Sequence, residues 1–85
     1  MYTVTIKRSA SKKLSSLRGS TRAKIAGAIN MLGINPDDQR LDIKKLQGVN
    51  GYKVRLGPWL IIYNRDYVLQ IIEIVKIGSR GDLYK

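Results

Sequence analysis

The chain has 85 residues, and its 16 lysines and arginines outnumber six acids, which gives a formal net charge of +10. It contains no cysteine or histidine, so a disulfide framework and a thiolate zinc site are excluded, and the commonest general base and metal ligand are missing. No apolar run approaches the ~20 residues that span a bilayer, and the opening MYTVTIKRSA lacks the apolar segment of a signal peptide. We therefore expect one cytoplasmic domain over residues 1–85, with no cofactor, no metal and no membrane partner.

The positive charge is concentrated near the start of the chain. Asp37 is the first acid, and the cations that precede it are Lys7, Arg8, Lys12, Lys13, Arg18, Arg22 and Lys24. A chain of this kind is attracted to polyanions such as nucleic acid, a ribosome or an acidic protein. The alternative is that the cations only keep a small protein in solution.

The first two segments predict a strand followed by a helix. Residues 2–7, YTVTIK, alternate apolar and polar side chains, which is typical of a half-buried strand. Apolar residues then recur at helical spacing, at Ala10, Leu14 and Leu17. Gly19 is expected to end this helix.

A second helix is predicted next, with Ser20 or Thr21 as its N-cap and an end at Gly33. Its apolar positions repeat the same spacing, at Ile25, Ile29 and Leu32. Gly27 inside it costs about 1 kcal/mol relative to alanine, so we expect a close approach to the first helix as compensation. The two helices should form an αα-hairpin.

The rest of the chain predicts strands. LDIKKL (41–46) is a short, weak one, and YKVRL (52–56) and WLIIY (59–63) are joined by a two-residue turn. Residues 64–66 are expected to form the next turn. YVLQIIEIVKI (67–77) is apolar on both faces, as in a central strand. The main order, β-α-α-β-β-β, predicts an α+β fold in which an antiparallel sheet carries the helix hairpin on one face.

The predicted hairpin separates two faces. If Gly57 and Pro58 form its loop, cross-strand partners share a face. One face then holds Lys53, Arg55, Leu60 and Ile62. The other is apolar enough to be the core under the helices and holds Tyr52, Val54, Leu56, Trp59, Ile61 and Tyr63. Sheet twist makes the cationic face open and concave. The alternative is that Lys53 and Arg55 are ordinary solvated residues.

Taken in order, several short motifs resemble the RelE/ParE toxin superfamily, and specifically its RelE-like branch. The family pattern begins with a Lys-Leu-x-Gly motif, followed by a strand with the pattern Tyr-basic-x-basic. Both occur in the segment KKLQGVNGYKVRLGPWLIIY, at residues 45–48 and 52–55. The next strand matches at Trp59, Ile61, Ile62 and Tyr63, and the closing segment IVKIGSRGDLY matches at Gly78, Arg80 and Tyr84. The resemblance covers essentially the whole chain, because the family has the same order of elements.

The resemblance implies a toxin of a type II toxin–antitoxin system, monomeric when alone. RelE-like members enter the ribosomal A site and cut mRNA without a metal. The 2′-hydroxyl attacks the adjacent phosphate and leaves a 2′,3′-cyclic phosphate. An acidic antitoxin wraps around the toxin and neutralises it. The implied partners are therefore the cognate antitoxin, the ribosome and mRNA.

The resemblance also assigns site residues. Lys53, Arg55 and Arg80 form a cluster of fixed cations, which would stabilise the negative charge that develops on the phosphate. Without histidine, a lysine whose pKa is lowered by neighbouring cations can take the 2′-proton, and Lys53 is the expected base. Tyr84 would stack on the substrate base or transfer a proton. Its alternative role is packing against the sheet.

Two positions depart from the family pattern. Leu60 stands where the family has an arginine opposite Arg55, a loss of about 2–4 kcal/mol of transition-state stabilisation. Ser79 stands where some relatives have histidine. Activity is then weaker or depends on another cation such as Lys76.

Three functions remain open from the sequence. The first is a ribosome-dependent mRNA endonuclease, which the closing Gly-x-Arg and Tyr84 favour. The second is a ParE-like toxin that inhibits DNA gyrase by binding. The third is a catalytically degenerate binding module. Leu60 favours the second or the third.

Overall fold

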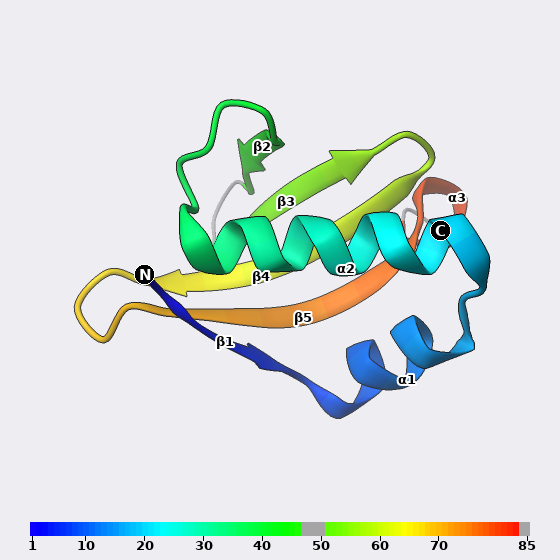
Figure 1. Cartoon of the computed structure of the whole chain (residues 1–85), viewed down its shortest axis with the longest axis horizontal. Coiled ribbons are helices and arrows are strands. Elements are labelled where there is room, and N and C mark those ends of the chain that lie inside the picture. Colours follow the sequence, from blue (N-terminus) through cyan, green and yellow to red (C-terminus); the bar gives the residue numbers. More distant parts are fainter. Residues whose placement is uncertain (47–50, 84–85) are drawn as a thin grey trace.

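The computed structural model describes residues 1–46 and 51–83. A short third helix follows the last strand (Figure 1). The elements are β1 (Thr3–Ile6), α1 (Arg8–Ser16), α2 (Gly19–Ile34), β2 (Asp42–Lys45), β3 (Gly51–Leu56), β4 (Trp59–Asp66), β5 (Ile71–Ser79) and α3 (Arg80–Leu83). The predicted α+β class is confirmed. The short strand predicted at 41–46 is present as β2, at one edge of the sheet.

The sheet has five strands in the order β1-β5-β4-β3-β2. The strands β2 to β5 pair antiparallel with their neighbours in sequence, as expected. The pairing of β1 with β5 is parallel, so the expectation of a purely antiparallel sheet is wrong at this edge. The reason lies in the connection: the two helices carry the chain from β1 across the sheet to β2 at the opposite edge. As predicted, β5 is an interior strand.

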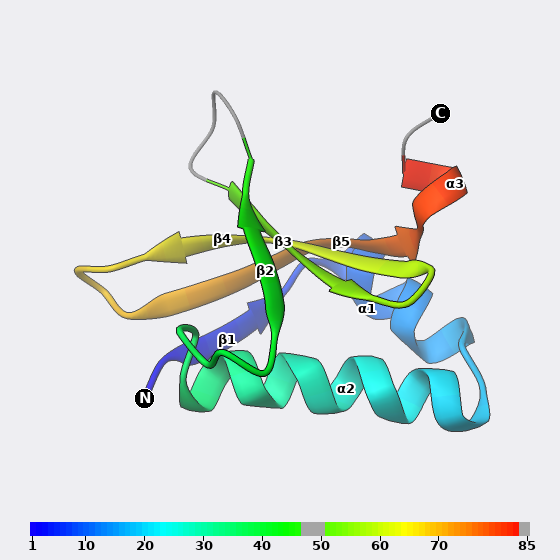
Figure 2. The same ribbon diagram turned by 90° about the horizontal axis from the view of Figure 1, so that it is seen from above.

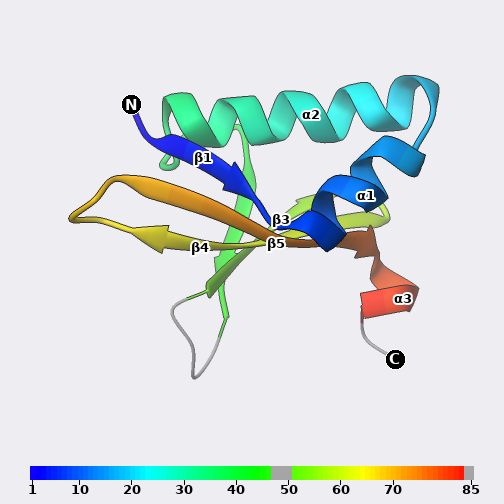
Figure 3. The same ribbon diagram turned by 90° about the horizontal axis from the view of Figure 1, so that it is seen from below.

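The core lies between the helices and one face of the sheet. Figures 2 and 3 show α1 and α2 on the same side, with α2 running along the sheet and α3 on the opposite side. The buried side chains of α2 include Ile25, Ala28, Ile29 and Leu32. They pack in one cluster with Val54, Ile61, Tyr63, Ile72 and Ile74 of the sheet. This leaves the other face of β2, β3 and β4 uncovered by α1 and α2.

The junction between the helices differs from the prediction. The first helix ends at Ser16, before Gly19, and Gly19 is the first residue of α2, with a φ of +57°. The N-cap position is Arg18, which makes no side-chain cap hydrogen bond, so Ser20 and Thr21 are not caps. The glycine is needed because this left-handed φ is costly for residues that have a Cβ.

Close helix packing occurs at a different glycine from the one expected. A Cβ placed on Gly27 would meet no atom within 4 Å, so this residue does not mediate an approach to α1. A Cβ on Gly33 would lie 2.9 Å from Cγ2 of Val4. In addition, the Tyr2 N–H donates to the Gly33 carbonyl oxygen at 2.7 Å. Gly33 therefore lets β1 pack directly against the end of α2, which extends one residue further, to Ile34.

The turn between β4 and β5 lies further along the chain than predicted. Residues 64–66 belong to β4, and the turn occupies 67–70. The Asp66 carboxylate oxygen Oδ1 accepts the N–H groups of Val68 at 3.0 Å and Leu69 at 2.9 Å. These two hydrogen bonds favour a turn that begins after Asp66. A turn at 64–66 would leave the N–H groups of Val68 and Leu69 without the Asp66 carboxylate as acceptor.

Candidate functional site

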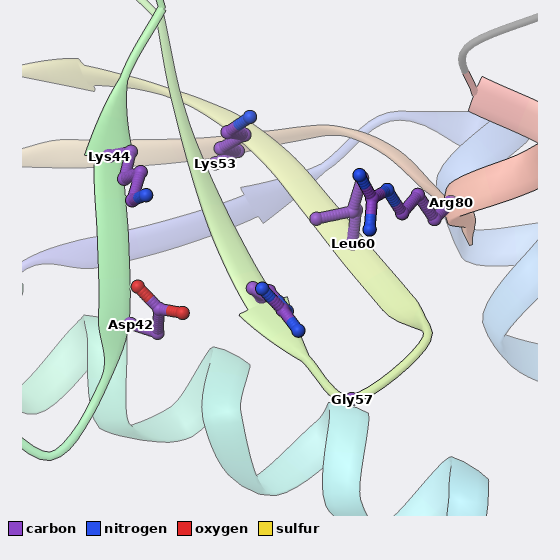
Figure 4. A pocket seen from close by; sticks show the side chains of 7 residues that line it. Asp42, Lys44, Lys53, Gly57, Leu60 and Arg80 are labelled. Atoms are coloured by element: carbon purple, nitrogen blue, oxygen red, sulfur yellow. The ribbon is translucent and has the colours of Figure 1, made fainter.

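A cavity of about 240 Å³ opens on the sheet face that α1 and α2 do not cover. Its lining residues are Asp42, Lys44, Lys53, Arg55, Gly57, Leu60 and Arg80 (Figure 4). Four of these side chains are cationic and one is a carboxylate. The cavity therefore suits an anion that is large enough to meet several cations at once.

Strand register explains how the cations reach one face. Arg55 pairs with Leu60, and Lys53 pairs with Ile62, as the two-residue turn predicts. The alternating residues Val54 and Ile61 are completely buried on the helix side. The predicted separation into an apolar core face and a cationic face is confirmed.

Arg80 joins the cluster from the far end of the chain. It is the first residue of α3, directly after β5, and its backbone N–H donates to the carbonyl oxygen of Pro58 at 2.8 Å. This bond ties α3 to the turn of the β3–β4 hairpin. Figure 4 shows the Arg80 side chain extending beside Leu60. The structure thus brings together Lys53, Arg55 and Arg80, which are far apart in sequence.

Three residues of the family pattern are not placed by this structure. Gln47, Gly48 and Tyr84 lie outside the described residues, so the role expected for Tyr84 stays a prediction. Lys76 is placed opposite Ile62 on β5, and it is exposed rather than part of the cavity lining. Because cross-strand partners share a face, Lys76 lies on the same sheet face as Ile62 and Lys53, and its use as a substitute for the missing arginine stays a prediction.

Strand β2 contributes two lining residues that sequence reasoning missed, Asp42 and Lys44. Asp42 pairs with Arg55, and Lys44 pairs with Lys53. Their signal is the alternation in LDIKKL, where Leu41 and Ile43 pack on the core side. The register of a strand this short could not be set without its partner strand, so the face of Asp42 stayed undetermined.

Leu60 is the one apolar side chain in this lining. It is only 4% exposed, although it lies on the cationic face, and it does not belong to the core cluster under the helices. Long cationic side chains often cover apolar surface with their methylene stems while the charge stays in water. The position of Arg80 beside Leu60 in Figure 4 fits this arrangement.

The cavity carries an excess of positive charge. Lys44 and Lys53 are direct cross-strand partners, and like charges at such positions are destabilising. The two ion pairs formed among the described residues, Arg40–Asp38 and Arg65–Asp37, lie elsewhere. The lining as a whole still holds four cations and one carboxylate, and this excess of positive charge favours an external polyanion.

A second, more apolar depression lies between α2 and the turn of the β3–β4 hairpin, with a volume of about 880 Å³. We call it the α2 groove, and its lining includes Ile25, Ala28, Met31, Leu41, Leu56, Pro58 and Trp59. Lys24 and Arg40 add positive charge to it. Nearby, the Lys13 ammonium lies 5.8 Å from the centre of the Trp59 ring. An apolar groove with cationic margins suits an acidic amphipathic segment.

The described residues contain no group of three carboxylates that could hold a metal ion. Across the same part of the chain, each helix is too short or too polar to cross a membrane.

Comparison with known proteins agrees with this geometry. The sequence model of a family described as the ParE toxin of the type II toxin–antitoxin system parDE matches residues 4–84. No curated protein sequence gives a significant match. Among solved structures, the chain is similar to one in the archaeal RelE–RelB complex of Pyrococcus horikoshii, with 28% identity and a TM-score of 0.82 over 94% of this chain and 96% of that one.

Two Escherichia coli structures share the fold. The isolated RelE toxin is 18% identical, with a TM-score of 0.78 over 99% of this chain and 92% of that one. YafQ is 17% identical, with a TM-score of 0.78 over the full length of both chains. The fold is thus RelE-like, and the match of the family model over nearly the whole chain settles its class. The chain belongs to the ParE toxin family, within the RelE/ParE superfamily of type II toxin–antitoxin systems.

Proposed function

We propose that this toxin is a ribosome-dependent mRNA endonuclease that acts in the cytoplasm and inhibits translation. The observation that carries the proposal is the cavity in which Lys53, Arg55 and Arg80 meet on an open sheet face. The similarity to a chain of the archaeal RelE–RelB complex supports it. Attack of a 2′-hydroxyl on the adjacent phosphate places negative charge on the phosphate oxygens and on the leaving 5′-oxygen. Fixed cations around that phosphate stabilise the charge and therefore lower the barrier.

Replacing Arg80 by alanine tests this role. Cleavage of ribosome-bound mRNA should fall by about 10²-fold or more, the scale for loss of one charge-stabilising group. Folding should be nearly unchanged, because Arg80 is exposed and an exposed cation adds little stability. The measurement is in-vitro translation followed by primer extension on the mRNA. Lys12→Ala, which removes an exposed cation from α1, is the matched control. A folded Arg80→Ala protein that cleaves at the wild-type rate would contradict the assignment.

We also propose that the α2 groove receives the cognate acidic antitoxin. The net charge of +10 favours fast, electrostatically steered association with an acidic partner, and the apolar lining supplies area that becomes buried. Lys24→Glu should weaken binding in calorimetry at moderate salt by more than Lys7→Glu does. Both variants make the same change of charge, but Lys7 lies before α1 and is not part of the groove lining. Equal losses in the two variants would show that the antitoxin does not use the groove.

A second candidate function is inhibition of DNA gyrase by binding. The specific observation in its favour is Leu60, because an apolar, buried residue stands where the nuclease pattern has a cation. In that case Lys53 and Arg55 form a docking surface. A gyrase supercoiling assay separates the two functions. If the wild-type protein inhibits supercoiling and leaves ribosome-bound mRNA uncut, the gyrase function replaces the nuclease.

A further inference from the structure

The proposed cleavage needs a group that accepts the 2′-proton, and the described residues that line the cavity include one carboxylate. Of the seven lining residues, Asp42 is the single acid. The other charged members are cations, which donate hydrogen bonds and have no lone pair for a proton in their charged form. Asp42 is exposed, and Figure 4 shows its carboxylate oxygens directed from β2 towards the space in front of β3.

Asp42 is also distinguished from the acids that serve the fold. Within residues 1–46 and 51–83, Asp37 and Asp38 are held in ion pairs, and Asp66 caps the β4–β5 turn. Asp42 takes part in none of the ion pairs of these residues, although its cross-strand partner is Arg55. A carboxylate near a phosphate site weakens binding of the anion. Its presence in the cavity is explained if it contacts a hydrogen-bond donor of the substrate.

We propose that Asp42 is the general base of the cleavage reaction, an inference that rests on the proposed nuclease function. A carboxylate oxygen of Asp42 removes the 2′-hydroxyl proton while the 2′-oxygen forms a bond to the adjacent phosphorus. The bond from phosphorus to the 5′-oxygen breaks, and the 5′-oxygen receives a proton from the Lys53 ammonium. The products are a 2′,3′-cyclic phosphate and a 5′-hydroxyl, and Asp42 and Lys53 regain their protonation states by exchange with water. Lys53 is thus assigned the opposite proton transfer from the one expected from the sequence.

The strand pairing gives this assignment its geometry. Asp42 lies on β2, directly across from Arg55, and Arg55 is in turn opposite Leu60 of β4, beside which Arg80 lies. A nucleotide in the cavity would place its phosphate near Arg55 and Arg80 and its ribose towards β2. The carboxylate repels phosphate oxygens and accepts from hydroxyl groups, so it favours this orientation over the reverse one. A 2′-deoxynucleotide at the cleaved position has no proton to offer and should not be cut.

The Asp42→Asn variant tests whether Asp42 accepts the proton as a general base or only positions the substrate. Asparagine keeps the size and an acceptor oxygen but cannot take a proton, so single-turnover cleavage should fall about 10²–10⁴-fold. Affinity for the mRNA-loaded ribosome should stay the same or rise, because one negative charge leaves the site. Asp42→Glu should recover part of the rate. Glu73→Gln, which neutralises a carboxylate on β5 outside the cavity, is the matched control and should cleave normally.

Each outcome bears on the inference. Slow cleavage with retained ribosome binding in Asp42→Asn, and partial recovery in Asp42→Glu, would support Asp42 as the base. If wild type and Asp42→Asn cleave equally fast, the base is another group while the nuclease function stands. If Asp42→Asn loses binding and cleavage together, Asp42 is structural and the inference is wrong. If the wild-type protein cuts no ribosome-bound mRNA, the nuclease function and the base assignment both fail.

Discussion

At the scale of single residues, Leu60 separates this chain most clearly from the family pattern. Its Cα partners are Arg55 on β3 and Gly78 on β5, so any side chain at this position starts at the centre of the cationic cavity. An arginine at this position would add its charge opposite Arg55 and beside the Arg80 side chain. The present leucine gives apolar burial in place of a further cation near the phosphate.

We predict that Leu60→Arg accelerates cleavage and lowers stability. The added cation can raise the rate by up to about 10²-fold, the scale of one charge-stabilising donor. The variant also loses a leucine that is 4% exposed, and burial of such a side chain is worth about 1.5–3 kcal/mol. Single-turnover cleavage and thermal unfolding measure the two effects. Leu60→Met, which keeps the volume and adds no charge, should leave both nearly unchanged. A folded Leu60→Arg protein that cleaves no faster would show that the missing cation does not limit the reaction.

At the scale of elements, α2 contains two glycines with opposite roles. Gly27 is exposed, and a Cβ there would enter open space. Gly33 is buried, and a Cβ there would come within 2.9 Å of the Val4 side chain on β1. Both lie in the same helix, so the intrinsic helical advantage of alanine over glycine is similar at the two sites. What differs is the packing with β1.

We predict that Gly27→Ala stabilises the protein and Gly33→Ala destabilises it. Alanine is favoured over glycine in a helix by about 0.5–1 kcal/mol, and nothing opposes that gain at Gly27. At Gly33 the added methyl group must push β1 away from α2 or distort Val4, and overpacking of this kind costs about 1–3 kcal/mol. Urea unfolding of the two variants gives the two free energies. Equal stabilisation by both would mean that β1 is not packed against Gly33 as described.

At the scale of the whole molecule, the parts of the fold that were predictable depend on local pattern. The two-residue turn at Gly57 fixes the register of Arg55 with Leu60, so the separation of the two faces followed from sequence alone. The parallel pairing of β1 with β5 joins segments that are distant along the chain, such as Val4 with Ile72, and no local pattern encodes it. For the same reason Asp42 was missed, because its place in the cavity depends on which strand lies beside β2.

A second long-range connection ties the loop after α2 to the end of β4. Asp37 accepts hydrogen bonds from the Arg65 guanidinium at 2.7 and 3.1 Å. The Arg65 side chain is only 9% exposed, and its guanidinium carbon lies 5.0 Å from the centre of the Tyr2 ring and 4.2 Å from that of Tyr67. The hydrogen bond from Arg65 holds the pKa of Asp37 below its usual value. By contrast, Asp38 is paired with Arg40, two residues away, and this hydrogen bond lowers the pKa of Asp38 to about 2.

We predict that the Asp37–Arg65 pair makes the fold sensitive to acid. A carboxyl whose pKa is lower in the folded state contributes stability above its unfolded pKa of about 4, and this contribution is lost as pH falls through the lowered folded value. Asp37→Asn should therefore reduce stability at neutral pH and flatten its decline as the pH falls below about 4. Asp38→Asn should change both less, because its partner is only two residues away and the pair can form in the unfolded chain. Urea unfolding of the wild type and both variants from neutral to acidic pH makes the comparison. If Asp38→Asn has the larger effect, the position of Arg65 between the two tyrosines does not depend on Asp37, and stacking on the rings is what holds it.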